Sequence, residues 1–486
     1  MKTKSIYISI LSLILFAPMF ASADNYGDRN NFFVDYNFGI TKATQISATL
    51  QNSTSSSISY YFDDQFWNTK TSEEKKQINL ILDSLSYEFE TNIHPKLTNA
   101  FGTEATPGID REKRITVLFY PMIENAKGYV RNIDEYEKTV VPESNQREII
   151  YLNTAILDSP ILKSFLAHEF MHLIEFNQKE QRTGTPEETW LSELRAEYAP
   201  TFLGYDNPAD DNNYLTNRIA IFLSKPYDSL TQWSGDIYDY GTVSMFGHYL
   251  ADQYGVDILV DSLRLSQKTG IDSINEALKR KGISDTFSSV FSNWIVASYL
   301  NDCTVNTRYC YKDKNLTDIH VIPFSNFMPF SGESSLSISQ TLPNWSAHWQ
   351  KFSGANKTLK LQFDGKGQAG IGVIYMIRDY SGKNEVKELA LDANKKGELI
   401  IPNMGIDKAS VMLIPFVKGT SKTDSFYSIT ASALNPTTVE PTNNTDNTIK
   451  LPFAIDKPIS QMNREELLTL LLKVIIYLVS QGKLNF

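Results

Sequence analysis

The segment His168-Glu169-Phe-Met-His172 has the residue types and the spacing of a metal-binding helix. Two histidines four positions apart lie on one helical face, so both imidazoles can reach a single ion. Glu169 lies beside that face, where it can take a proton from a water molecule on the metal. The chain has only six histidines, so chance gives this spacing around a glutamate in well under about one in a hundred such sequences. The motif therefore predicts the zinc site of a hydrolase.

A second acidic segment, Trp190-Leu-Ser-Glu193-Leu-Arg-Ala-Glu197-Tyr, follows the motif along the chain. Zinc hydrolases use a third protein ligand and leave one position open for water. Glu193 and Glu197 are four positions apart and share a helical face. One carboxylate can bind the ion while the other holds a ligating histidine ring by a hydrogen bond.

These two segments, with the preceding Ser144-Asn145 and Tyr151-Leu-Asn153, resemble the gluzincin metallopeptidases and the hyicolysin-like family in particular. The resemblance covers roughly residues 40–300. It implies that Glu193 is the third zinc ligand and that Glu197 supports a ligand without touching the ion.

A more distant resemblance connects the chain with the gluzincin aminopeptidases, from which it departs at Leu194, where those enzymes have Gly. Their Gly-x-Met-Glu-Asn motif, which holds a free amino terminus, is absent, and this favours endopeptidase action. Tyr238-Asp-Tyr240-Gly resembles their Tyr-x-Lys-Gly segment and implies that Tyr238 is the donor to the oxyanion. Tyr240 is the second choice for this role, and His248 is the third.

The predicted function is that of a secreted zinc endopeptidase with Zn²⁺ as cofactor and a protein or peptide as substrate. Peptide hydrolysis needs a general base, here Glu169, and a donor to the developing oxyanion. The strand at Ile115–Tyr120 and the turn at Asn125–Tyr129 are candidates for pairing with the substrate backbone. Two alternatives stay open: an adhesin-like surface-binding protein on a metallopeptidase scaffold, and a zinc hydrolase acting on a non-protein bond.

The elements that position this chemistry follow from hydrophobic periodicity. Alternation and short apolar runs predict strands at 46–50, 58–62, 115–120 and 148–152. Helical spacing predicts helices at 72–93, 160–177, 186–199 and 242–254, with two or three more in 258–299. The predicted fold class is α+β, with a zincin-like catalytic domain made of a mixed sheet and a helical subdomain over residues 24–325.

The composition changes after the catalytic domain. Alternating strands separated by Gly, Asn and Lys turns predict a β-sandwich-like domain at 326–434. A Pro/Thr/Asn-rich linker at 435–460 precedes an amphipathic C-terminal helix at 461–486. Its apolar stretch is too short for a bilayer core, so contact with a membrane interface or cell surface is one prediction for it.

The ends and the overall charge indicate an exported protein. Residues 1–23 have the basic start, apolar run and small-residue site of a signal peptide that is cleaved after Ala23. In an oxidising compartment Cys303 and Cys310 are expected to form a disulfide. The formal net charge of −10 argues against nucleic acid as a partner.

Overall fold

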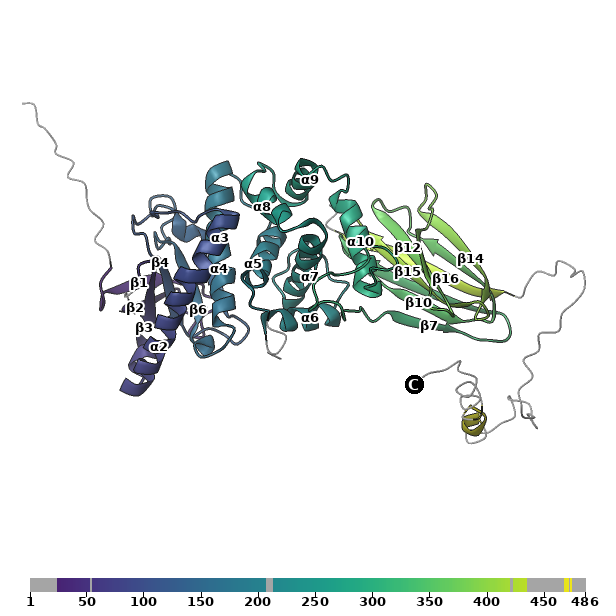
Figure 1. Ribbon diagram of the computed structural model, residues 1–486, viewed down its shortest axis with the longest axis horizontal. Coiled ribbons are helices and arrows are strands. Elements are labelled where there is room, and N and C mark those ends of the chain that lie inside the picture. The colour runs from purple at the N-terminus through teal and green to yellow at the C-terminus, as the bar shows by residue number, and fades with distance from the viewer. Residues whose placement is uncertain are drawn as a thin grey trace, which may run out of the picture. The chain divides into compact units, whose positions relative to one another are not determined.

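The computed structural model describes residues 24–52, 55–206, 213–419, 423–434, 467–471 and 473. The predicted signal peptide, the linker and most of the C-terminal helix lie outside the described residues. Residues 467–471 and 473, the described part of 461–486, are helical. The described residues between 24 and 434 form a mixed sheet, a group of helices and a β module (Figure 1). The α+β class is confirmed.

The N-terminal sheet has six strands in the order β1-β2-β3-β4-β6-β5. Strands β3, β4 and β6 run parallel to one another, whereas the pairs β1–β2, β2–β3 and β5–β6 are antiparallel. The strands are β1 (Arg29–Phe33), β2 (Gln45–Asn52), β3 (Ile58–Asp63), β4 (Ile115–Tyr120), β5 (Gly128–Val130) and β6 (Ile149–Asn153). The three-residue strand β5 therefore forms one edge of the sheet.

Both faces of this sheet are buried, which explains why its central strands are continuous apolar runs. On β3, Tyr60 and Phe62 face the main core with the helices, while Tyr61 between them faces a smaller core. Helices α2 (Ser72–Glu88), α3 (His94–Phe101) and α4 (Leu162–Glu175) line the main core (Figure 1). Thr71 begins α2 with a capping box to Glu74, which fixes the start of that helix.

Helix α4 and the helices that follow it form the second part of the main core. They are α5 (Thr189–Leu203), α6 (Tyr214–Ser224), α7 (Ile237–Tyr254), α8 (Asp257–Arg264), α9 (Gly270–Arg280) and α10 (Phe287–Leu300). Helix α5 packs between α4 and α7, and α6 packs on α7. Short turns of other helical types lie at Phe89–Ile93, Asn132–Glu135, Thr154–Ile156 and Phe176–Gln181.

The β module is nearly closed. Its strands form one sheet in the order β13-β12-β15-β14-β11-β16-β8, with β9 and β10 paired to β15 and β7 paired to β10. Strands β14 and β15 are joined only where Met404 pairs with Lys408, and the curved sheet encloses one apolar core. The strands are β7 (Phe324–Met328), β8 (Ser334–Leu342), β9 (Ser346–Ala347), β10 (Gln350–Gly354), β11 (Lys357–Asp364), β12 (Ile371–Asp379), β13 (Asn384–Glu388), β14 (Lys396–Met404), β15 (Lys408–Val417) and β16 (Ser425–Leu434).

The β module shares a core with the helices. On β15, Val411 and Leu413 point into the module, whereas Met412 and Ile414 belong to the main core with α10. This alternation follows from the period of two in a strand and buries both faces of β15. The indole N–H of Trp349 also donates to the carbonyl of Ile295 on α10 at 2.9 Å. Apolar packing and a buried hydrogen bond thus fix the module to the helices.

Among the described residues, no helix combines the length and the apolar character that a membrane span needs.

Candidate metal centre

Helix α4 carries the His-Glu-x-x-His motif, and its two histidines lie on one face of the helix. The rings of His168 and His172 are neighbours, with centroids 5.0 Å apart. His168 and Glu169 are buried, and His172 is partly exposed. The helix is held from behind by apolar residues that include Leu166, Phe170 and Leu173. Packing of the apolar positions therefore directs both imidazoles to the same side of α4.

Glu193 on α5 reaches the two rings from the neighbouring helix. Its Oε2 atom lies 3.3 Å from Nε2 of His168 and 3.6 Å from Nε2 of His172. One ligand atom from each residue lies within 4.8 Å of the other two. The Oε2 atom is shielded from solvent and has no partner of hydrogen-bonding geometry among the described residues. Two imidazole nitrogens and an unsatisfied carboxylate oxygen form a donor set that fits zinc.

The electrostatics of these three groups are strongly coupled. Burial works to raise the pKa of Glu193, but the neighbouring His172 and His168 outweigh it and hold that pKa far below its usual value. Burial works to lower the pKa of His172, and Glu193 outweighs it and raises that pKa to about 9. Glu193 and His172 thus each favour the charged form of the other, and the carboxylate of Glu193 stabilises positive charge at this position.

Glu169 is buried next to His168, His172 and Glu193. Burial raises the pKa of its carboxyl to about 7, although His168 and His172 act in the opposite direction. Gly128, at the start of edge strand β5, lies against the carboxyl group of Glu169, because an added Cβ would lie only 2.9 Å from Oε1 of Glu169. A carboxyl group with a pKa near neutrality is suited to accept and return a proton.

The residues of the motif line a cavity of about 930 Å³. Its lining includes His168, Glu169, His172 and Glu193, the segment Asn125–Val130, and Tyr240. Burial raises the pKa of Tyr240, and Glu193 and Glu169 raise it further, so its hydroxyl stays a neutral donor. Carboxylate, hydroxyl and imidazole groups therefore line the same cavity as β5.

The other two candidates for the oxyanion donor lie elsewhere. Among the described residues Tyr238 is not part of the cavity lining, and its ring lies against the ammonium of Lys225 at 4.8 Å. His248 is buried, with Nε2 2.7 Å from the hydroxyl of Thr201 and Nδ1 2.7 Å from the carbonyl of Ser244. The geometry thus favours Tyr240, the second choice, over Tyr238.

The two strands expected to pair with a substrate also differ. The prediction for Ile115–Tyr120 is wrong, because this segment is β4, which is hydrogen-bonded to β3 on one side and to β6 on the other. The turn at Asn125–Tyr129 leads into β5, at the edge of the sheet. An edge strand offers backbone groups to an incoming chain, and a central strand does not.

Glu197 lies behind His168. Its Oε1 atom is 3.6 Å from Nδ1 of His168, and the hydroxyl of Tyr214 lies between them, 3.0 Å from Nδ1 and 2.7 Å from Oε1. Arg218 donates to both oxygens of Glu197 at 2.7 Å. On the other ring, Nδ1 of His172 lies 3.2 Å from the hydroxyl of Ser192.

Sequence reasoning missed three of these residues, namely Ser192, Tyr214 and Arg218. Tyr214 and Arg218 are four positions apart on α6 and share a helical face, which was a detectable signal. Ser192 immediately precedes Glu193, the candidate ligand on α5.

A second group of carboxylates, from Asp228, Asp236 and Asp239, also lies within 4.8 Å. Lys225 forms an ion pair with Asp228 at 2.5 Å, and Asp239 Oδ2 accepts hydrogen bonds from the amide and the hydroxyl of Ser234. Oδ2 of Asp228 is buried without a hydrogen-bond partner among the described residues, and the group has no imidazole.

The two cysteines lie after α10. The structure joins Cys303 to Cys310, with Cα atoms 5.1 Å apart, and the bond closes a short loop.

Two solved structures resemble part of the chain at low scores. The pre-peptidase C-terminal domain of a collagenase from Bacillus anthracis has 12% identity and a TM-score of 0.17, over 23% of this chain and 96% of that chain. PliG of Aeromonas hydrophila, a periplasmic inhibitor of g-type lysozyme, has 8% identity and a TM-score of 0.15, over 23% of this chain and 98% of that chain. TM-scores this low establish neither fold nor function.

No family model matches the chain. Over 191 residues it is 26% identical to the neutral metalloprotease ShpI of Staphylococcus hyicus, a match that covers 35% of this chain and 42% of that protein. The chain thus spans less than half the length of this curated relative. This similarity supports a metalloprotease relationship.

Proposed function

We propose that this protein is a secreted, zinc-dependent metalloendopeptidase of the gluzincin type. The observation that carries the proposal is the position of Glu193 Oε2, an unsatisfied buried oxygen next to Nε2 of both His168 and His172. Export rests on the signal-peptide pattern of residues 1–23.

His168, His172 and Glu193 would hold the zinc ion. When bound there, zinc supplies a Lewis acid that polarises a carbonyl and makes a water molecule more acidic. Glu169, with its pKa raised to about 7 by burial, takes a proton from the attacking water and later delivers it to the leaving amine. The hydroxyl of Tyr240 donates a hydrogen bond to the carbonyl oxygen as negative charge develops there.

The substrate backbone is expected to extend along β5. Among the described strands β5 pairs only with β6, and residues of β5 line the cavity together with Glu169. Added as a further strand, a peptide would bring a carbonyl close to α4 without needing a free terminus. This arrangement, with the absence of the amino-terminus motif from the sequence, favours internal cleavage.

The proposal is tested on the purified secreted chain by zinc analysis and by cleavage of casein. Glu169→Gln should keep zinc and lower the rate by roughly 10²- to 10⁴-fold, the usual contribution of a general base. Glu143→Gln, an exposed matched substitution, should act like the wild type. Wild-type protein without zinc, or Glu169→Gln with the wild-type rate, would overturn the proposal. Zinc without proteolysis would instead favour the surface-binding alternative.

A further inference from the structure

Both histidine rings of the proposed site are contacted on the nitrogen that faces away from Glu193 by a hydroxyl group from another helix. Nδ1 of His168 lies 3.0 Å from the hydroxyl of Tyr214 on α6. Nδ1 of His172 lies 3.2 Å from the hydroxyl of Ser192 on α5. In each case Nε2 is the nitrogen that faces Glu193. The two contacts therefore occupy equivalent places on the two rings.

The direction of the hydrogen bonds behind His168 follows from the charged groups at their end. Arg218 can only donate, and it donates to both oxygens of Glu197 at 2.7 Å. A carboxylate held in this way accepts from the hydroxyl of Tyr214 at 2.7 Å. With its proton committed to Glu197, the oxygen of Tyr214 accepts from Nδ1–H of His168. The lone pair of that imidazole is then on Nε2.

The chain of contacts behind His172 has the same order. The hydroxyl of Ser192 lies near enough to the carboxyl of Glu175 to lower its pKa, and Arg195 donates to Oε2 of Glu175 at 2.7 Å. Burial raises the pKa of Glu175, and Arg195 opposes that rise. The oxygen of Ser192 is left to accept from Nδ1–H of His172, which again places the lone pair on Nε2.

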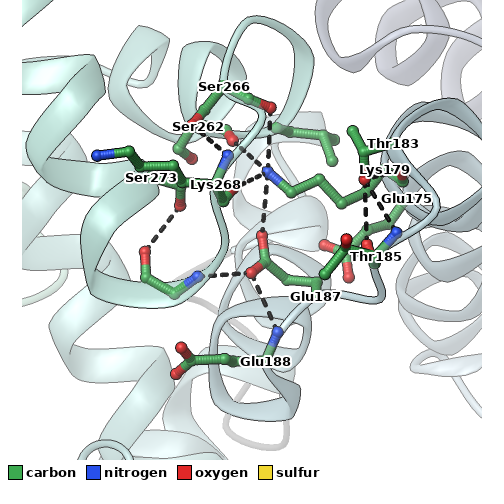
Figure 2. A network of polar contacts seen from close by, with 12 residues as sticks. Glu175, Lys179, Thr183, Thr185, Glu187, Glu188, Ser262, Ser266, Lys268 and Ser273 are labelled. Atoms are coloured by element: carbon green, nitrogen blue, oxygen red, sulfur yellow. Dashed lines mark hydrogen bonds and ion pairs between the residues drawn. The ribbon is translucent and has the colours of Figure 1, made fainter.

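The second chain is anchored deep in the helical part of the protein. Arg195 is fully buried and donates to Glu187 at 2.9 Å as well as to Glu175. Glu187 lies 3.9 Å from the ammonium of Lys179, which is bonded to the carbonyls of Ser262, Ser266 and Lys268 (Figure 2). The ring of His172 is thus connected to the segment between α8 and α9.

We propose that Tyr214 and Ser192 are positioning residues that hold His168 and His172 in the Nδ1–H tautomer with Nε2 directed at the metal. Each acts through a hydroxyl–carboxylate–arginine chain, which ends at Arg218 for the first ring and at Arg195 for the second. The inference rests on the proposed function, since it assigns a purpose to these chains only if a metal binds at Nε2. It predicts that both hydroxyls contribute to zinc affinity although neither touches the ion.

The test is zinc affinity of the full secreted chain, measured by competition with a chromophoric chelator. Tyr214→Phe and Ser192→Ala each remove one hydroxyl, and each should weaken zinc binding by roughly 10- to 100-fold, as loss of a partner behind a ligand does. Ser192→Thr keeps a hydroxyl and should restore affinity. Tyr205→Phe and Ser55→Ala are matched controls, because these hydroxyls also bond to glutamates, Glu88 and Glu90, away from the motif.

Combined substitutions separate positioning from general destabilisation. Tyr214→Phe together with Glu197→Gln should weaken zinc binding no more than the worse of the two single changes, because both lie in one chain. Tyr214→Phe together with Ser192→Ala should show the product of the two losses, because they lie in different chains. The absorption spectrum of the cobalt-substituted protein should change in both single variants and stay unchanged in the controls.

Two results would overturn the inference while leaving the proposed function intact. One is a zinc-binding, proteolytic wild type whose Tyr214→Phe and Ser192→Ala variants bind zinc as tightly as it does. The other is an equal loss of affinity in Tyr205→Phe. A wild type that binds no zinc would overturn the proposed function, and the inference with it.

Discussion

Gly128, the first residue of edge strand β5, lies against the proposed general base. A Cβ on this residue would lie 2.9 Å from Oε1 of Glu169, 2.9 Å from Cδ2 of Leu152 and 3.0 Å from the carbonyl oxygen of Tyr151. The carbonyl belongs to the paired strand β6 and cannot retreat without disturbing the sheet, so the carboxylate of Glu169 must yield. We predict that Gly128→Ala impairs catalysis and leaves zinc in place.

The size of the effect follows from the packing. An extra methyl group in a well-packed site costs about 1–3 kcal/mol. If this cost falls on the placement of Glu169 in the transition state, kcat/KM decreases roughly 5- to 150-fold, at about 1.4 kcal/mol per factor of ten. No atom of the three proposed ligands is among the atoms nearest to the added Cβ, so the zinc content should equal that of the wild type.

The assay is steady-state cleavage of a quenched fluorescent peptide, with zinc measured on the same samples. Gly39→Ala is the control, because its Cβ would meet only Cε2 of Tyr120, at an ordinary 3.4 Å. Its kcat/KM should stay within about twofold of the wild type, as expected for a substitution that creates no strain. A folded, zinc-loaded Gly128→Ala protein with the wild-type kcat/KM would refute the placement of Glu169 as the base beside β5.

Three further predictions concern other parts of the molecule. Tyr240→Phe should lower kcat by roughly 10²- to 10³-fold, as removal of an oxyanion donor does. Tyr238→Phe should have almost no effect in the same assay, and the reverse result would restore Tyr238 as the oxyanion donor. Arg195→Met leaves the buried carboxylates of Glu175 and Glu187 without their shared partner, so urea unfolding should show a loss of about 3–5 kcal/mol, and a loss below about 1 kcal/mol would contradict the ion-pair assignment. Burial raises the pKa of Glu148 to about 7, so the folded state binds the proton more tightly than the unfolded chain, and this contribution to stability is lost as pH rises from about 4.5 to about 7. In the wild type the free energy of unfolding should fall between pH 5 and pH 8, and in Glu148→Gln this fall should be smaller by roughly 3 kcal/mol. The same fall in both proteins would contradict the raised pKa of Glu148.

Local geometry explains what could be predicted from the sequence. The spacing of His168 and His172 fixes their common face once a helix is accepted, because positions i and i+4 are neighbours on any helix. The strands at Ile58–Asp63 and Ile115–Tyr120 were predictable as elements, since long apolar runs are typical of buried strands. Their order in the sheet depends on contacts between distant segments. The interpretation of Ile115–Tyr120 as an edge strand failed for this reason.

The choice between Tyr238 and Tyr240 depended on where one helix begins. Residues two positions apart in a helix point about 200° from each other, so both tyrosines cannot face the same cavity. The predicted helix begins at Thr242, whereas α7 begins at Ile237 with a capping box formed by Asp236 and Asp239. Both tyrosines therefore lie on the helix, and its packing directs Tyr240 to the cavity. An aspartate cap three residues before another aspartate was a readable signal for that start.

The charges buried around the histidines are more readily explained by placement than by stability. Taking an ion pair out of water costs about as much as its attraction returns, and apolar replacements of such pairs are often neutral or stabilising. Yet the side chain of Arg195 is wholly buried and that of Arg218 is only 14% exposed. Each pairs with a carboxylate that lies beside a hydroxyl group in contact with Nδ1 of a histidine. A core built only for stability would gain nothing from this repetition. A core that must keep two imidazoles in one tautomer needs a group of fixed polarity behind each ring, and a guanidinium, which can only donate, supplies that polarity.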